Sequence, residues 1–172
     1  LNIPSKLEVV DCYAFCACAA LPDITLPDGL KSIDEYAFMS CYEFTEIDIP
    51  EGVTLMGQNC FGDCPKLERV SLPESLQELG VNAFFGCPLL REVNIPESIT
   101  ELSAGLFQGC ESLESVVLPP RLKIVGDFAF DGCTSLTQID IPASVTHINQ
   151  SAFAYCLSLE RATVRNEHLK QI

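Results

Sequence analysis

Three residue types recur at a constant interval of 23 positions along this chain of 172 residues. The three series run through the sequence without a single insertion. They are Pro4, Pro27, Pro50, Pro73, Pro96, Pro119 and Pro142; Cys18, Cys41, Cys64, Cys87, Cys110, Cys133 and Cys156; and Phe15, Phe38, Phe61, Phe84, Phe107, Phe130 and Phe153. A fixed period of this length indicates a repeat architecture. It excludes a doubly wound sheet or a helix bundle, whose elements differ in length.

One unit, Cys133 through Tyr155, shows the pattern C-x-x-L-x-x-I-x-I-P-x-x-L-x-x-I-x-x-x-A-F-x-x. Within it Ile139 and Ile141 alternate with Asp140, which predicts a short strand with one buried face and Asp140 pointing outward. The following proline lacks the backbone N–H that a parallel ladder needs, so the strand ends there.

The second half of the unit predicts a different backbone. Val145 and Ile148 follow at a spacing of three and lead into Ala152 and Phe153, which indicates a second short extended piece and then one helical turn. A unit has no opposite layer of its own, so it must bury its apolar side chains against the next unit. We therefore expect residues 1–172 to form a single α/β repeat solenoid of about seven units.

The ends of the sequence carry a further expectation. The chain begins with Leu1, without an initiator methionine and in the middle of a unit, so we interpret it as a fragment of a longer chain. Leu1 with Ile3 at one end, and Val164 at the other, are apolar strand positions without polar caps. We expect flanking repeats or a docked subunit to cover them.

Charge and hydropathy exclude two classes of partner. Acidic residues outnumber basic residues by 24 to 10, which gives a formal net charge of −14. Such a charge repels phosphate backbones, so no nucleic acid partner is expected. No apolar run approaches the roughly 20 residues that span a bilayer, so no membrane insertion is expected.

The units resemble the repeats of the BspA-like family, the treponemal type of leucine-rich repeat, over residues 3–164. The resemblance rests on I-P, then x-x-V-x-x-I, then A-F-x-x-C-x-x-L, in seven consecutive copies. It implies a curved right-handed leucine-rich-repeat array, in which the I-x-I-P strands form a concave parallel sheet. Members of the family resemble bacterial surface adhesins or surface and intracellular proteins of protists, so the resemblance implies a fold more firmly than a partner.

Seven of the ten cysteines belong to the repeating series, so we interpret them as a ladder of small buried thiols. The β-carbons of stacked neighbours would lie about 4.8 Å apart, whereas an unstrained disulfide needs roughly 3.8 Å between them. Cys60 occupies the alanine position and is expected in the core, whereas Cys12 and Cys16 are expected to be exposed and reactive. No histidine lies near these groups, so we expect neither a metal site nor a cofactor.

Candidate catalytic groups are sparse. His147 and His168 lie in different units, and neither has a paired nucleophile in the pattern. The glycines form no phosphate-binding loop. We therefore expect no enzyme activity.

The outward positions of the predicted strands are the best candidates for a partner-binding surface on the concave sheet. They form two columns, Asp23, Glu46, Arg69, Glu92, Ser115, Gln138 and Arg161 beside Thr25, Asp48, Ser71, Asn94, Val117, Asp140 and Thr163. These columns contain no aromatic residue, whereas strong protein interfaces usually centre on Tyr, Trp or Arg. Tight binding is therefore not predicted there.

Two further sets of residues remain open as alternatives. An aromatic edge at the Ala-Phe segment either forms an exposed patch or covers the core. It comprises Tyr13, Tyr36 and Phe128 in one column and Met39 and Phe85 in another. An acidic column after the prolines either extends into water or is relieved by a cation or a basic partner. It comprises Asp28, Glu51, Glu74 and Glu97.

These observations favour a non-catalytic protein-interaction module of surface-adhesin type. The family resemblance favours a cell-surface or extracellular location. The alternative is an intracellular scaffold or assembly subunit that docks partner proteins through the solenoid. Many free thiols fit a reducing cytosol or an anaerobic surface better than an oxidising secretory route.

Overall fold

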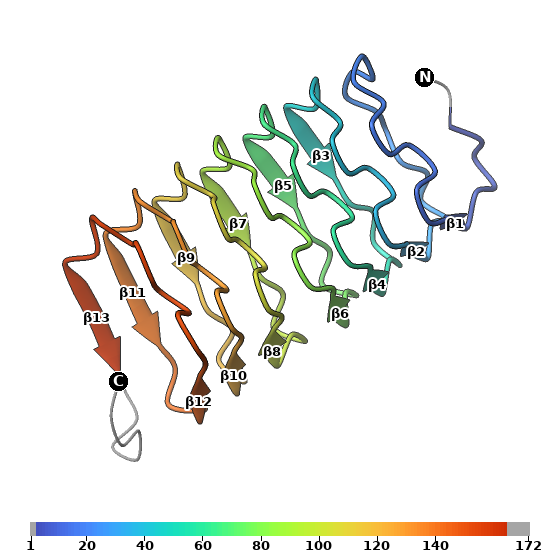
Figure 1. Ribbon diagram of the computed structural model, residues 1–172. Helices are drawn as coiled ribbons and strands as arrows, with labels where there is room; N and C mark the ends of the chain where they lie inside the picture. Colours follow the sequence, from blue (N-terminus) through green and yellow to red (C-terminus); the bar gives the residue numbers. More distant parts are fainter. Residues whose placement is uncertain (1–2, 165–172) are drawn as a thin grey trace.

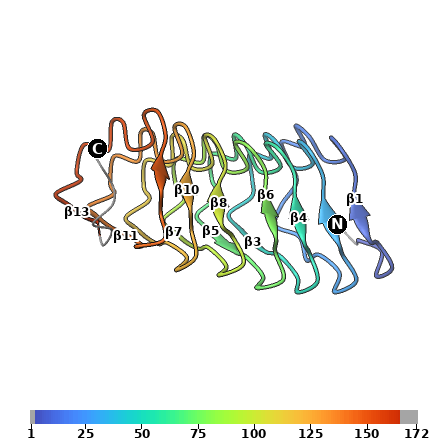
Figure 2. The same ribbon diagram turned by 90° about the horizontal axis from the view of Figure 1, so that it is seen from below.

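The structure, a computed structural model, describes residues 3–164. The chain winds in successive coils that stack on one another, so the two ends of the described chain lie at opposite ends of the array (Figure 1). The coils contribute strands to two rows of parallel strands, which run along different sides of the array (Figures 1 and 2). The predicted repeat solenoid of about seven turns with a period of about 23 residues is confirmed.

The first row, which we call the long-strand sheet, comes from the I-x-I-P segment. Its strands are β3 (Glu46–Asp48), β5 (Arg69–Ser71), β7 (Glu92–Asn94), β9 (Ser115–Val117), β11 (Gln138–Ile141) and β13 (Arg161–Val164). Pairing is parallel and joins residues 23 positions apart, as between Val70 and Val93. In β3 to β9 the middle residue is buried and its two neighbours are not, as the alternation predicts. Because β9 contacts β11, the pair β11–β13 continues the row.

The second row, the short-strand sheet, confirms the second extended piece. Its strands are β1 (Val9–Val10), β2 (Ser32–Ile33), β4 (Leu55–Met56), β6 (Glu78–Leu79), β8 (Glu101–Leu102), β10 (Ile124–Val125) and β12 (His147–Ile148). They pair in parallel in the orders β1-β2-β4-β6 and β8-β10-β12. From β1 to β10 the second residue of each strand is buried and the first is not.

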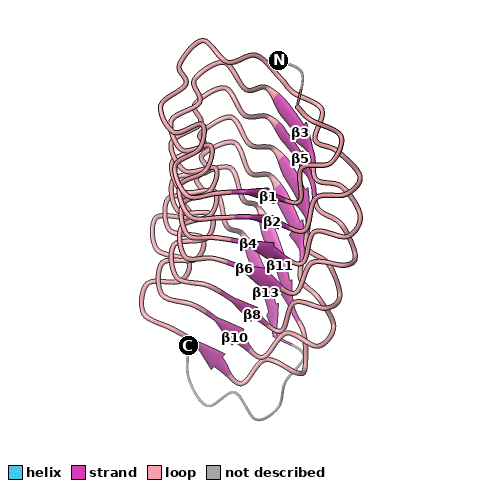
Figure 3. Ribbon diagram, turned by 90° about the vertical axis from the view of Figure 1, so that its right-hand side faces the viewer, coloured by secondary structure: helices cyan, strands magenta, loops and turns pink. Residues whose placement is uncertain are grey.

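The segment that carries the Ala-Phe pair forms consecutive turns, so the predicted helical turn is wrong and the α/β class is not confirmed. These turn segments span residues 12–17, 35–40, 58–63, 81–86, 104–109, 127–132 and 150–155, and no helix occurs within residues 3–164 (Figure 3). The second and sixth residues of each turn segment have positive φ, for example 57° at Asn82 and 66° at Gly86. An α-helix requires negative φ throughout. Within the described range there is accordingly no helix that could cross a membrane.

Backbone N–H groups of the turn segments bond alternately to the next unit and to their own turn. Phe84 N donates to Leu106 O of the following unit at 3.1 Å. The next residue, Phe85, donates instead to Asn82 O of its own turn at 3.0 Å. A buried N–H without an acceptor is costly, so a turn segment needs a neighbouring unit to satisfy its backbone.

The phenylalanine and cysteine series form aligned interior rows, as predicted. Successive phenylalanine rings stack at centroid distances of 5.2 to 6.0 Å. From Cys41 onward, each cysteine thiol of the series donates to the carbonyl of the phenylalanine 26 residues earlier, on the neighbouring coil, as from Cys110 Sγ to Phe84 O at 3.3 Å. The cysteine series thus adds a hydrogen bond between units and does not merely fill space. Of the series, Cys18 and Cys156 at the two ends are half-buried and the other five are buried.

Glycines permit the closest approach between units. A Cβ atom at Gly80 would lie 2.4 Å from the carbonyl carbon of Gly57, and one at Gly57 would lie 2.6 Å from the backbone nitrogen of Glu35. Neighbouring units therefore meet backbone to backbone where the short strands end.

Gly80→Ala is expected to lower the free energy of unfolding by about 1–3 kcal/mol, because the added methyl group forces two units apart. Gly29→Ala is the matched control, since its Cβ would meet no atom closer than 3.8 Å. The control is expected to be neutral or to raise stability by up to about 1 kcal/mol. Urea unfolding measures both, and equal losses in the two variants would contradict the close approach.

Candidate partner-binding face

Most of the predicted binding residues lie at outward positions of the long strands. These twelve residues, which we call the long-strand face, are Glu46, Asp48, Arg69, Ser71, Glu92, Asn94, Ser115, Val117, Gln138, Asp140, Arg161 and Thr163. Arg69, Ser71 and Thr163 are half-buried and the others are exposed. The remaining two predicted residues, Asp23 and Thr25, precede β3 and lie outside any strand.

Asp23 caps the edge of the sheet where the sequence predicted a further strand. Its Oδ1 accepts hydrogen bonds from the N–H groups of Thr45 (2.7 Å) and Glu46 (3.2 Å), and its Oδ2 accepts one from the Thr45 hydroxyl (2.6 Å). Desolvation acts to raise the pKa of Asp23, but these hydrogen bonds outweigh it and hold the pKa below its ordinary value. The carboxylate therefore accepts hydrogen bonds from N–H groups that would otherwise bond to the carbonyl groups of a preceding strand.

Arg69 forms ion pairs with both acidic residues of β3, so its one positive charge offsets one of their two negative charges. Its Nη1 lies 2.9 Å from Asp48 Oδ1, and its Nη2 lies 3.1 Å from Glu46 Oε2. Hydrogen bonds to Asp48 first, and then to Glu46, raise the pKa of Arg69. Such solvent-exposed pairs contribute little to stability. The two ion pairs instead lower the negative charge that the face presents, because the guanidinium of Arg69 engages both carboxylates.

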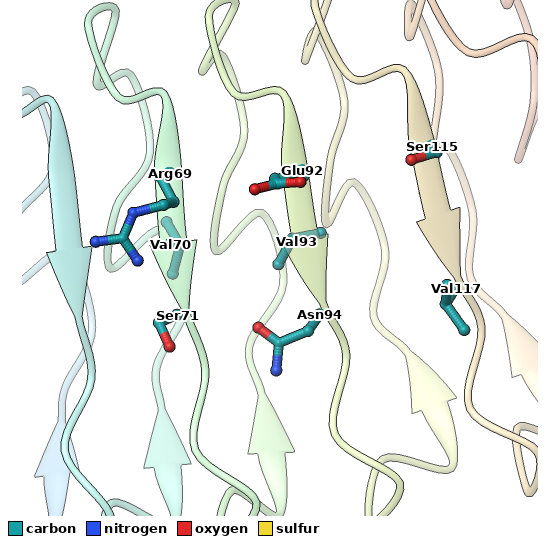
Figure 4. Close-up of a pocket in the computed structure, with 8 residues that line it drawn as sticks. All are labelled: Arg69, Val70, Ser71, Glu92, Val93, Asn94, Ser115 and Val117. Atoms are coloured by element: carbon teal, nitrogen blue, oxygen red, sulfur yellow. The ribbon is translucent and has the colours of Figure 1, made fainter.

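An open depression of about 360 Å³ lies over β5, β7 and β9, on the side of Arg69 that is away from β3 (Figure 4). Glu92 lies above Asn94 on the middle strand, and Val117 lies on the next one. The Asn94 amide is occupied, since Nδ2 donates to Leu72 O at 3.2 Å. No ion pair within residues 3–164 engages Glu92. Val117 is 80% exposed, which is the largest exposed fraction among the large apolar side chains of the described chain.

The aromatic edge divides into two parts. Tyr13 and Tyr36 stack with ring centroids 4.7 Å apart, and Tyr13 is 58% exposed. Phe128 shares their column but lies beyond three intervening units. Met39 and Phe85 are half-buried. Tyr13 and Phe128 are therefore exposed at separate places, Tyr36 is half-buried beneath the stacked Tyr13, and Met39 and Phe85 partly cover the core.

The acidic column after the prolines is exposed along its length, and Glu51 Oε1 accepts a hydrogen bond from Glu74 N at 3.2 Å.

Within residues 3–164, the side chains whose spacing would suit a metal ion lie away from this column. Asp11, Cys12 and Asp34 have ligand atoms within 4.8 Å of one another. Sequence reasoning missed this group, although Asp11 and Asp34 share one position in adjacent units.

The two histidines do not meet in any described site. His147 lies in β12, and its Nδ1 is 2.9 Å from the Thr146 hydroxyl. His168 lies outside the described residues.

All ten cysteines are free. Cys60 is buried, as predicted, while Cys12 is exposed and Cys16 is half-buried. Burial raises the pKa of Cys41 to about 12 and that of Cys156 to about 11. At neutral pH these two groups are therefore protonated thiols, which are poor nucleophiles.

Labelling of the native protein with a maleimide at neutral pH is expected to modify Cys12 first and Cys16 more slowly. Cys41 and Cys110 should react only after unfolding, because burial blocks access and disfavours the thiolate. Mass spectrometry of the digested protein measures the order. Protection of both Cys12 and Cys16, or labelling of Cys110 in the native state, would contradict this arrangement.

Comparison with known families identifies the repeat. A model of the BspA type leucine rich repeat region, in six copies, matches residues 1–114 and 100–172. The chain belongs to the BspA-type leucine-rich-repeat family. The resemblance of the repeat pattern is thereby confirmed, and repeat proteins of this class are typically protein-interaction modules.

Solved structures of other proteins share this BspA-type fold. A leucine-rich repeat protein from Bacteroides ovatus is 34% identical, with a TM-score of 0.85 over 96% of this chain and 49% of its own. The leucine rich repeat protein of T. pallidum is 36% identical, with a TM-score of 0.72 over 77% of this chain and 62% of its own. A leucine rich cell surface protein from Faecalibacterium prausnitzii is 28% identical, with a TM-score of 0.59 over 96% of this chain and 59% of its own.

The BspA-type chain spans about half to three-fifths of the length of these relatives. Among curated protein sequences, none matches it.

Proposed function

We propose that this chain is a non-catalytic protein-interaction module of surface-adhesin type, which binds a partner protein on the long-strand face. The observation that carries the proposal is the depression beside Arg69, where an unengaged carboxylate and an exposed valine stand on adjoining strands. As the family resemblance implies, we propose that the array is curved and right-handed and that the long-strand face lies on its concave side. Parallel strands hold such side chains at fixed spacing, which lowers the entropy lost on binding.

The chemistry of the depression defines the partner. Arg69 is satisfied by two carboxylates of its own face, so it does not require an acidic partner. Glu92 has no such counter-charge, and Val117 presents apolar surface beside it. The partner would place a basic side chain at Glu92 and an apolar side chain at Val117. Because the rest of the face is polar, we expect moderate affinity.

Two settings fit this function. A surface location accords with the Faecalibacterium prausnitzii relative, which is described as a cell surface protein. An intracellular scaffold or assembly subunit accords with ten free cysteines, since free thiols persist in reducing compartments. In either setting we propose that flanking repeats or a docked subunit cover the end units, where Phe15 and Phe153 are only half-buried. The net charge of −14 argues against nucleic acid as the partner.

A photoreactive amino acid in place of Val117 tests the proposed face. On irradiation with intact cells or with cell extract, it is expected to crosslink one defined protein. The same amino acid in place of Gln77, which is exposed directly before β6, is the matched control and should not capture that protein. Capture on intact cells supports the adhesin setting, and capture from the cytosol supports the scaffold.

Adding Glu92→Lys to the photoreactive chain is expected to lower the crosslinking yield by about tenfold or more, because like charges at an interface cost over 1 kcal/mol. Gel densitometry of the crosslinked band measures the yield. Equal capture from positions 117 and 77, or a yield that Glu92→Lys leaves unchanged, would rule out this face.

A further inference from the structure

A second depression, of about 450 Å³, lies where the short strands β4 and β6 end. Gly57 and Gly80 lie in it beside their sequence neighbours, and residues from the two preceding units, Cys12, Asp34 and Glu35, complete its lining. Glu78 and Leu55 come from the strands before the glycines, and Val81 comes from the turn segment after Gly80. We call this the glycine groove. It belongs to the short-strand sheet and is separate from the long-strand face.

The floor of the glycine groove has no side chains that could fill it. The glycines are required because a Cβ atom would lie 2.4 Å from backbone at Gly80 and 2.6 Å from backbone at Gly57. Side chains therefore stand on both sides of a line of bare backbone. Leu55 is half-buried and Val81 is 40% exposed, so both offer apolar surface to an occupant.

The charge of the glycine groove is of one sign. Asp34, Glu35 and Glu78 line it, and no lysine or arginine does. Within residues 3–164, none of the three carboxylates takes part in a salt bridge. This differs from the long-strand face, where Arg69 engages two carboxylates. A depression lined by one sign of charge concentrates ligands of the opposite sign.

A stacked tyrosine pair, in which Tyr13 is exposed and Tyr36 is half-buried, borders the same groove. Gln58, which lines the groove, donates from Nε2 to Tyr36 Oη at 2.8 Å, and Tyr13 N donates to Glu35 O at 3.0 Å. The two tyrosine rings stack with an interplanar angle of 7°. Both residues have a φ of 58°, in the left-handed region that disfavours bulky side chains. The equivalent positions of the other five units also have positive φ and hold Asn59, Asn82, Gly105, Phe128 and Ser151. Because the fold accepts such different residues at this position, it does not by itself call for tyrosine there.

We propose that the glycine groove binds an extended, arginine- or lysine-bearing segment of a partner protein. The aliphatic stem of a basic side chain packs on Leu55 and Val81. Its charged end is held by Glu35 and Glu78, because charge-assisted hydrogen bonds are the stronger class. The exposed ring of Tyr13 accepts a guanidinium on its face. Arginine is therefore preferred to lysine, since its planar group also stacks.

The test uses a fluorescein-labelled peptide, Arg-Gly-Arg-Gly-Arg, whose binding to the chain is followed by fluorescence anisotropy at physiological salt. The double variant Glu35→Gln and Glu78→Gln is expected to weaken binding by about tenfold or more. The matched control, Glu51→Gln with Glu74→Gln, removes the same two charges from the acidic column after the prolines. The two variants have the same net charge, so they differ only in where the charges are removed. The control should weaken binding by less than about twofold, because Glu51 and Glu74 do not line the glycine groove. Equal losses in the two double variants, or no binding by the unaltered chain, would overturn the proposal.

Tyr13→Asn separates the aromatic contact from stability. Asparagine tolerates the left-handed backbone, so the variant should unfold at the same urea concentration as the parent or a higher one. It is expected to bind the arginine peptide several-fold more weakly, with a smaller loss for the lysine counterpart of the peptide. Unchanged affinity for the arginine peptide would contradict the contact with Tyr13.

Discussion

Each turn segment leaves backbone donors that only the next unit can accept, and the remaining structure depends on this constraint. The N–H of Phe61 bonds to Ala83 O, and that of Phe107 bonds to Ala129 O. The phenylalanine carbonyls are used as well, because each of those from Phe15 to Phe130 accepts a hydrogen bond from the cysteine thiol 26 residues later, on the neighbouring coil. Since hydrogen bonds, stacked rings and close glycine contacts all cross the same junction, a unit gains its stability from its neighbours.

Repetition also determines where function can arise. Positions that serve the junction are occupied by the repeating residues, which leaves the outward positions of the strands free to vary. On the long-strand face, variation places Arg69 between acidic residues and leaves Glu92 and Val117 available. On the short-strand sheet, it places acidic residues and a tyrosine pair around bare glycine backbone. The two surfaces differ in chemistry, so the two partners that we propose would bind at separate places on one array.

The sequence alone predicted the period, the strands and the interior rows, because burial imposes the same residue at the same place in every unit. It did not predict the turn segments. The spacing of Ala152 and Phe153 is also compatible with a helical turn, and the glycines at positions 86, 109 and 132 were not recognised as one left-handed column. All fourteen candidate residues were placed on predicted strands, and twelve of them lie on strands in the structure. The ion pairs of Arg69 could not be derived, since they depend on which rotamers a long side chain adopts. The glycine groove had a visible signal in Gly57, Gly80 and Gly126, which share one position, but its depth follows from backbone contacts that no pattern specifies.

Native-state hydrogen exchange at the phenylalanine amides tests most directly whether stability lies between units. The amides of Phe84 and Phe107 donate to the following unit, whereas Phe153 has no following unit within residues 3–164 to receive its N–H. If the junctions hold the array together, Phe84 and Phe107 will exchange slowest, at rates that approach global unfolding, and Phe153 will exchange fastest of the three. Equal protection of Phe153 and Phe84, or rapid exchange at Phe84 in the folded protein, would contradict the account.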